Sequence, residues 1–415
     1  MKQTIAILSV FLLFNLSDAN AQFDPVKRCI VDSNGDCLPN ALLTALPFLR
    51  IVPDARGGAM GDAGLTTSAD PNSLHYNSSK LAFVDKDMSF SATYTPWLRN
   101  LGLQDVYLAY LSGYKKVNDR EALGFGLRFF SLGEINFTDF NGNPAGTGSP
   151  RELEFAISYN RKLSENFSAG LSAKYMYSNL AAGQAINNVP ISAANAFAVD
   201  LSLTYKKPGN ITAYGSEWTF GAALTNLGSK ITYTGNEFKD FLPSNLGIGA
   251  GLLLNFDDFN SMSFHLDVNK LLVPSPQSPL LIDEDGNRIP NEDYDANMNG
   301  EPDYKEQSNF GALFNSFGDA QGGFGEELKE FNFSLGIEYW YNKQFAVRTG
   351  YYYENPIKGD RQFLTVGAGL KYNVFAIDIS YLVPTNNRRN PLDNTLRFTL
   401  QFDFEALTGD YGDDQ

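Results

Sequence analysis

The stretch FSAGLSAKYMYS, residues 167–178, alternates apolar and polar residues with a period of two. Its apolar positions are Phe167, Ala169, Leu171, Ala173, Tyr175 and Tyr177, and its small or polar positions are Ser168, Gly170, Ser172, Lys174 and Ser178. Because successive side chains of a β-strand point to opposite faces, this pattern predicts a strand with one apolar and one polar face. Its length meets the roughly 9–11 residues that a tilted strand needs to cross a bilayer.

The same alternation returns along the chain from about residue 86, for example in FAVDLSLTYK at 197–206 and LRFTLQFDF at 396–404. The polar faces carry charges at mid-strand, at Asp200, Asp267 and Asp378. Aromatic residues gather near the strand ends. A soluble β-sandwich also alternates and remains the alternative, but long strands, charged polar faces and aromatic girdles are typical of a transmembrane antiparallel β-barrel with a polar lumen.

Counting these segments predicts about fourteen strands, an even number, as bacterial single-chain barrels have. They lie near 86–95, 103–115, 121–133, 150–161, 166–179, 195–206, 216–228, 244–256, 260–272, 328–341, 343–354, 361–372, 374–384 and 394–404. If both termini are periplasmic, every second connection should be short, and all are short except 206–217, which is of modest length. The other connections, expected outside the cell, include the long loops 134–149, 181–194, 229–243 and 273–327.

Composition excludes several functions. The 415 residues carry 47 acidic and 32 basic side chains, a formal charge of −15, and no basic cluster. Nucleic acids and anionic membrane surfaces need a basic patch, so neither is expected as a partner. The two histidines, His75 and His265, have no Ser or Cys nucleophile at a recognisable spacing, and His265 falls on a predicted lumen face. We therefore expect structural or lumen-lining histidines and no enzyme.

The first residues predict export. Lys2, the apolar run that follows and Ala19-Asn20-Ala21 form a signal peptide over residues 1–21, so the mature chain begins at Gln22. In an oxidising compartment, Cys29 and Cys37 are read as a disulfide, with a metal site as the less favoured alternative. Later segments lack the run of about 20 apolar residues that a membrane helix needs. The predicted organisation continues with an N-terminal segment and lumen plug (22–85), the outer-membrane barrel (86–404) and an acidic tail (405–415).

The longest loop contains DANMNGEPDYKE, residues 295–306, which matches the spacing of a twelve-residue calcium loop. Its expected ligands are Asp295, Asn297, Asn299, Glu301, Asp303 and Glu306. The alternative is a solvated acidic loop, because acidic residues crowd this region and make a chance match easier. Apart from this calcium ion, no cofactor is expected.

A segment before the first strand, 44–64, fits neither helical nor strand periodicity. It belongs to LPFLRIVPDARGGAMGDAGLTTSADPNSLHYNSSKLAF, residues 46–83, which resembles the N-terminal signature of the PorV (LptO) outer-membrane proteins of the type IX secretion system, a branch of the FadL-like barrels. The positions that carry the likeness are Pro53, Asp54, Arg56, Gly58, Gly61, Asp62, Gly64 and Asn77. FadL-like proteins generally have Asn-Pro-Ala where this chain has Asn77-Ser78-Ser79.

The resemblance implies an adaptor of protein secretion in the outer membrane of a Gram-negative bacterium. Such a protein binds the C-terminal signal domain of cargo at a giant translocon barrel (SprA/Sov-like) and passes it to a PorU-like sortase complex, surrounded by outer-membrane lipid. The alternative is a FadL-type transporter of long-chain fatty acids or other hydrophobic small molecules. Lipopolysaccharide deacylation, proposed for relatives, lacks a catalytic constellation here.

The odd segment predicts a plug inside the barrel, because a chain that threads the lumen must turn sharply and pack closely. Glycine permits both, and Pro53 fixes the entry. Asp54, Arg56 and Asp62 should then face the polar wall. Opposite charges on that wall, such as Lys174, Lys206 or Arg397, are expected to meet them.

Overall fold

The structure is a computed structural model. It describes residues 22–24, 29–31, 41–99, 102–138, 142–181, 184–186, 189–235, 239–277, 280–282, 288–292, 294–320, 323–386 and 395–404. Two units form, Met1–Asn40 and Ala41–Gln415. In the first, β1 (Gln22–Asp24) pairs antiparallel with β2 (Cys29–Val31). The signal peptide, Cys37 and the acidic tail lie outside the described residues, so the cleavage site and the Cys29–Cys37 disulfide stay predictions.

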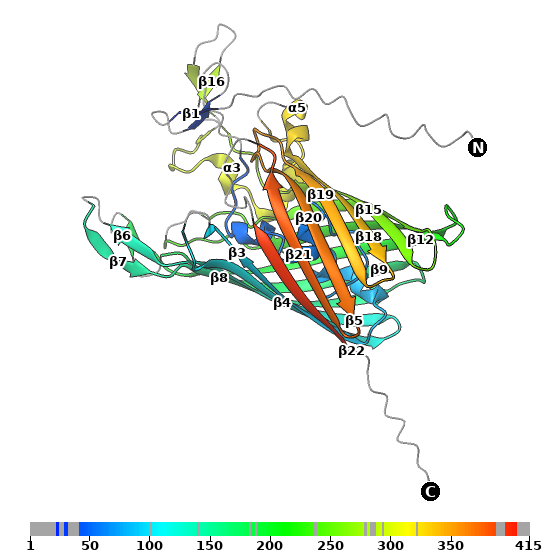
Figure 1. Ribbon diagram of the computed structural model, residues 1–415. Helices are drawn as coiled ribbons and strands as arrows, with labels where there is room; N and C mark the ends of the chain where they lie inside the picture. Colours follow the sequence, from blue (N-terminus) through cyan, green and yellow to red (C-terminus); the bar gives the residue numbers. More distant parts are fainter. Residues whose placement is uncertain are drawn as a thin grey trace. The chain divides into compact units, whose positions relative to one another are not determined.

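The second unit contains a closed antiparallel barrel of fourteen strands, as the alternation predicted (Figure 1). The strands are β3 (Met88–Pro96), β4 (Val106–Asn118), β5 (Glu121–Leu132), β8 (Arg151–Lys162), β9 (Phe167–Asn179), β12 (Ala194–Gly209), β13 (Ser216–Gly228), β14 (Asn245–Asn255), β15 (Asn260–Leu271), β18 (Phe331–Tyr341), β19 (Phe345–Tyr353), β20 (Gln362–Tyr372), β21 (Phe375–Pro384) and β22 (Leu396–Phe404). Each pairs with its neighbours in chain order, and β22 pairs with β3 to close the wall. Closure leaves no unpaired edge strand in the barrel.

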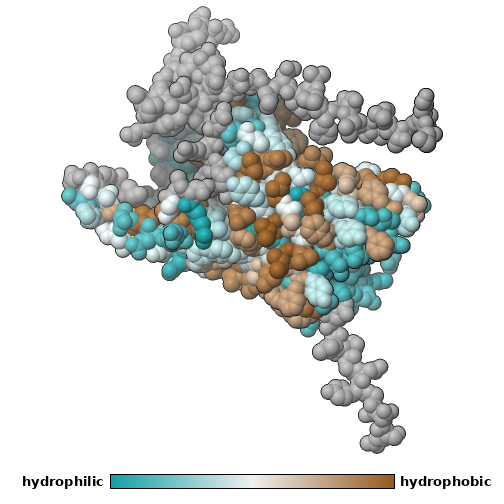
Figure 2. All heavy atoms as spheres, viewed as in Figure 1, coloured by the Kyte–Doolittle hydropathy of each residue, from teal (hydrophilic) through white to brown (hydrophobic). Residues whose placement is uncertain are grey.

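The two faces of the wall differ as the period of two requires. On β9, Ser168, Ser172 and Lys174 point inward and are buried, whereas Leu171 points outward and is exposed. Figure 2 shows apolar side chains gathered on the outer wall over β20, β21 and β22. The exposed apolar residues there include Leu364, Val366, Leu370, Ile377, Ile379, Val383, Phe398 and Leu400. The outer wall is therefore suited to lipid and the inner wall to polar contacts.

Connections alternate between the two ends of the barrel. At one end, here called the short-turn rim, they span 119–120, 163–166, 210–215, 256–259, 342–344 and 373–374. At the other, the long-loop rim, they include 133–150, which contains the hairpin β6 (Ile135–Thr138) and β7 (Pro144–Gly148), 180–193 with β10 (Ala185–Ile186) and β11 (Val189–Pro190), 229–244 and 272–330. This is the phase that the sequence predicted.

The connection 272–330 is the long loop. It holds β16 (Leu280–Ile282), β17 (Arg288–Pro290), α3 (Asp303–Glu306), α4 (Asn309–Asn315), α5 (Phe324–Glu327) and the 3-10 turn η4 (Leu328–Glu330). Two buried lysines fasten its end to the barrel: Lys270 pairs with Glu327 and Glu330, and Lys358 with Glu326 and Glu330, at 2.5–3.2 Å. Among the helices in the described parts of the chain, none has the length and apolarity to span a bilayer.

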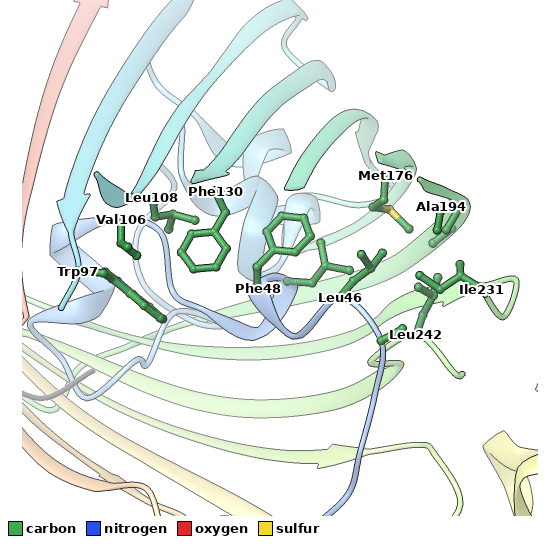
Figure 3. Close-up of a cluster of buried hydrophobic side chains, with 14 of the residues drawn as sticks. Leu46, Phe48, Trp97, Val106, Leu108, Phe130, Met176, Ala194, Ile231 and Leu242 are labelled. Atoms are coloured by element: carbon green, nitrogen blue, oxygen red, sulfur yellow. The ribbon is translucent and has the colours of Figure 1, made fainter. Parts of the chain in front are cut away.

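Residues 41–85, here called the plug, run through the barrel as short helical turns. These are η1 (Pro47–Arg50), α1 (Ala55–Gly58), α2 (Ser73–Tyr76) and η2 (Ser78–Phe83). Figure 3 shows Leu46 and Phe48 of the plug among side chains of the wall. Phe48 stacks on Phe130 at a centroid distance of 6.4 Å, and Trp97 meets Phe130 edge-on. The plug of the predicted fold class is present, with its apolar anchor at η1.

Candidate functional site: the plugged lumen

Backbone amides of the plug are bound by inward side chains from separate strands. The amide N–H groups of Ala55 and Gly61 donate to the hydroxyls of Thr399 and Thr365, each at 2.8 Å. Those of Gly64 and Leu65 donate to one carboxylate oxygen of Asp267, at 2.7 and 2.8 Å, and that of Ser79 to Ser202 at 3.0 Å. Turns that lack regular hydrogen bonding therefore find partners in the wall, as buried backbone groups must.

Arg56 joins the plug to the wall through a chain of alternating charges. Its guanidinium donates to both oxygens of Glu338, at 2.9 and 2.7 Å, and to Asp70 at 2.9 Å. Glu338 also accepts from Arg348 at 2.7 Å, and Arg348 reaches Asp378 at 2.5 Å. The two-pronged contact between Arg56 and Glu338 fixes orientation as well as distance. Every one of these charges has a partner, which a buried ion requires.

Arg128, fully buried on β5, holds the apolar end of the plug. It donates to the carbonyl oxygens of Phe48 and Leu49, at 3.2 and 3.1 Å, and pairs with Glu154 at 3.1 Å. Its Nη2 also donates to Nδ1 of His75 at 2.7 Å. Burial first, and then the charge of Arg128, hold the pKa of His75 well below its ordinary value. His75 is thus a neutral acceptor with a structural role.

The signature residues of the plug meet inside the barrel. Asp54 caps α1 by accepting from the Gly57 amide at 2.8 Å, and it accepts from the Tyr76 hydroxyl at 2.6 Å. The Asn77 amide group donates to the carbonyls of Leu65 and Leu203 and to the Thr204 hydroxyl, at 3.0–3.1 Å. Pro53 lies directly before this capped turn, a position that the fixed φ of proline allows.

The glycines mark close approaches. Gly61 has a φ of +63° and lies against the Tyr351 backbone, Gly64 lies under the Tyr76 ring, and Gly58 lies against the Arg397 guanidinium. A side chain at any of the three would overlap its neighbour. The wall also has a glycine at a close approach: at Gly350, a Cβ atom would overlap the backbone of Met60. Plug and wall are thus fitted to each other at backbone level.

Two of the three expected charge partners of the plug are wrong. Lys174 pairs with Asp200 at 2.7 Å and Glu154 at 3.5 Å, and Lys206 pairs with Glu217 at 3.0 Å. Both lysines pair with carboxylates on adjacent strands, and the contact of Lys206 with the plug is to the Phe83 ring, at 5.2 Å, and not to a carboxylate. On the plug side, Arg56 pairs with Glu338, a wall residue that the sequence analysis did not name.

Arg397, the third expected partner, does lie against the plug. It packs on Gly58, and its charge acts on Asp62, yet its Nε and Nη1 and the Oδ1 of Asp62 find no hydrogen-bond partner among the described residues. Asp62 sits at a φ of +65°. Burial raises the pKa of Asp62 to about 6, against the lowering effects of Arg397 and Arg361. Asp62 and Arg397 thus each keep buried polar atoms without a hydrogen-bond partner among the described residues.

A cavity of about 120 Å³ with a mixed polar and apolar lining lies between plug and wall. Asp62, His75 and Tyr76 of the plug line it together with wall residues that include Asp267 and Asn269. Carboxylates, amides and hydroxyls face this space, which suits water molecules that bridge polar groups.

The predicted calcium loop is folded at the long-loop rim. The carboxylate of Asp295 accepts from the amides of Asn299 and Gly300, at 3.0 and 2.9 Å, and Glu306 accepts from the side chains of Asn297 and Asn299. Asp303 begins α3, and Glu301 is buried. Within the described ranges, no group of three or more His, Cys, Asp or Glu residues is arranged to hold a metal. The calcium site stays a prediction.

Glu338, Arg348, Arg128 and Glu154 were the functional residues missed by sequence reasoning. All four lie at inward positions of strands that alternate, so a charge in mid-strand on the polar face was the available signal. The mid-strand charges named from the sequence are Asp200, Asp267, Asp378, Lys174, Lys206 and Arg397. Which charges meet depends on how neighbouring strands are staggered, and the alternation does not contain that information.

Solved structures similar to this chain include the toluene transporter TbuX of Ralstonia pickettii (13% identity, 85% of this chain and 98% of the other, TM-score 0.47), a FadL homologue of Pseudomonas aeruginosa (13%, 88% and 100%, 0.41) and the toluene transporter TodX of Pseudomonas putida (12%, 83% and 95%, 0.43). No curated protein sequence matches. The family model of the type IX secretion system protein PorV matches residues 35–278, more than half of the chain. With its closed fourteen-stranded barrel and plug, the chain belongs to the PorV family of type IX secretion system outer-membrane proteins.

Proposed function

We propose that this PorV-family barrel is a secretion adaptor that binds the C-terminal signal domain of cargo at the giant translocon barrel and delivers it to a surface sortase complex. Type IX secretion follows from the family. Our proposal goes further than the family match in three respects. It names the delivery steps, the partners (a SprA/Sov-like translocon and a PorU-like sortase) and the contacts with cargo.

The observation that carries the proposal is the filled lumen. Plug and wall are joined by the Arg56–Glu338–Arg348 chain, by the Arg128 clamp and by backbone contacts at Gly61 and Gly350. A cavity between them has a volume of about 120 Å³ and is lined by charged residues, such as Asp62 and Arg361, as well as apolar ones, such as Val52 and Leu65. Pockets for small organic ligands usually have about 300–1,000 Å³ and are mostly apolar. An interior that the plug fills and ties to the wall favours a scaffold over a FadL-type passage for fatty acids.

Because the plug occupies the interior, we assign cargo binding to the loops of the long-loop rim. Both histidines support a role without bond breaking, since His75 is held by Arg128, and His265 contacts Thr66 at 3.0 Å and Ser263 at 2.9 Å inside the lumen. The outer wall, apolar over its strands, would contact outer-membrane lipid.

A gene deletion with complementation tests the adaptor. We expect the deletion to abolish surface attachment and release of cargo, to leave oleate uptake unchanged, and to be rescued by the intact gene. If cargo still reaches the surface while oleate uptake falls, the adaptor is wrong and the transporter is right. Immunoblots for the translocon barrel in the deletion strain control for loss of a neighbour.

A further inference from the structure

The long loop presents aromatic side chains to solvent. Phe310 and Phe314 on α4 are 72% and 65% exposed, and Phe317 just after it is 47% exposed. The first two rings meet edge-on at a centroid distance of 5.1 Å, and Phe314 and Phe317 line one shallow hollow with Asp319. We call these three phenylalanines the aromatic face. Contiguous exposed apolar groups of this kind mark interaction sites more often than idle surface.

The helix that carries the face is held in place. Ser308 caps α4 by accepting from the Gly311 amide at 3.0 Å, and the side chain of Asn309 donates to the carbonyl of Gly228 at the end of β13, at 2.9 Å. Ala312, fully buried, packs in a cluster at the long-loop rim, which contains Leu42, Phe241, Leu271 and Val273. Since positions 310 and 314 lie on the opposite side of the helix from 312, the rings face away from the barrel. A fixed helix loses little entropy on binding.

Charge narrows the kind of partner. The connection 273–330 carries thirteen acidic and three basic residues, and no Lys or Arg occurs between 306 and 328. Glu326, Glu327 and Glu330 are paired with the barrel lysines, whereas Glu306 is exposed. Asp319 is half-buried and lines the hollow with Phe314 and Phe317. An anionic lipid surface attracts basic segments and repels this one. Charge complementarity therefore favours a protein partner whose contact surface is apolar at its centre and carries lysine or arginine around it.

We propose that the aromatic face is the docking surface for the folded C-terminal signal domain of a secreted protein, whose contact is apolar with a basic rim. This inference rests on the proposed adaptor function. Phe317 lies over the Lys270 ammonium of β15, 5.7 Å from its ring centroid, and forms the inner edge of the face. Because the Phe310 and Phe314 rings point away from the barrel at the long-loop rim, a soluble domain can reach them from water without entering the lipid that surrounds the strands.

Binding measurements on the full-length barrel in detergent test this inference. The probe is a fluorescently labelled C-terminal signal domain, purified from a protein that the same bacterium secretes through this system. The F310S/F314S variant should bind it at least about tenfold more weakly, because aromatic anchors dominate interface energies. Raising NaCl from 50 to 500 mM should weaken binding to the unaltered barrel, since the basic rim is screened.

The matched control is F256S/F259S. It removes two exposed phenylalanines, 45% and 56% exposed, from the short-turn rim and should leave the affinity unchanged. Both variants must retain the migration of unheated folded barrel on gels. If the unaltered barrel does not bind the domain, the adaptor function fails as well. If it binds and F310S/F314S binds equally, or if F256S/F259S weakens binding as much, the docking surface is refuted and the adaptor stands.

Discussion

At the scale of single residues, the plug works because buried charges are matched. Arg56, Glu338 and Arg348 share their hydrogen bonds so that none is left as an isolated ion, and Glu354 is likewise held by Arg50 at 3.1 Å and Arg361 at 2.7 Å. Burial would raise the pKa of Glu354, but Arg361 and then Arg50 lower it to about 2. Asp62 and Arg397 are less well matched, because Oδ1 of Asp62 and Nε and Nη1 of Arg397 have no hydrogen-bond partner among the described residues.

Asp62 gives a pH dependence whose sign follows from its raised pKa. The pKa of Asp62 rises from 3.8 to about 6 in the folded protein, so between these values the folded state binds more protons than the unfolded state. The contribution of Asp62 to the free energy of unfolding is therefore most favourable at low pH, and it falls as pH rises from about 4 to about 6. Asp62→Asn removes the charge while keeping the shape of the side chain.

We expect D62N to be more stable than the unaltered protein at pH 7.5, by about 1–3 kcal/mol. The difference should disappear below about pH 4. Urea unfolding of both proteins in lipid vesicles between pH 3.5 and 8 measures this. A difference that stays constant over that range would show that Asp62 does not titrate as its burial requires.

At the scale of elements, strands were predictable and the plug's contacts were not. The period of two at 167–178 and its repeats placed all fourteen strands, because alternation is a local consequence of the pleat. The pairing of Arg56 with Glu338 spans 282 positions and depends on strand stagger, so the local sequence pattern did not reveal it. For the same reason, the pattern did not show that Lys174 and Lys206 pair with carboxylates of adjacent strands. The glycines of 57–64 did signal close packing, and the partners at Gly350 and Tyr351 came only with the barrel.

Gly350→Ala tests the fit between β19 and the plug. The added methyl group would overlap the backbone of Met60, so we expect the plug to be displaced, with an overpacking penalty of about 1–3 kcal/mol. In planar bilayers the G350A barrel should then conduct, whereas the unaltered barrel should not. Gly325→Ala in α5, where a Cβ meets nothing within 4 Å, is the control and should stay closed. A closed G350A barrel with normal folded migration would refute the proposed fit.

At the scale of the whole molecule, three surfaces have separate tasks. The outer wall faces lipid, the plug fills the interior, and the long-loop rim presents the folded segments that remain free to bind. The central claim is that the plug stays in place while the protein works. A transporter would need the plug to move, whereas an adaptor uses the barrel as a rigid base.

A disulfide between plug and wall tests that claim most directly. The hydroxyls of Ser78 on η2 and Ser202 on β12 lie 3.0 Å apart, so S78C/S202C can form a bond with a small shift, and the single variants S78C and S202C are the controls. Mass spectrometry verifies the bond, and cargo at the cell surface is measured with and without reductant. We predict that the locked barrel secretes cargo as the unaltered protein does. Loss of secretion that reductant restores would contradict the account.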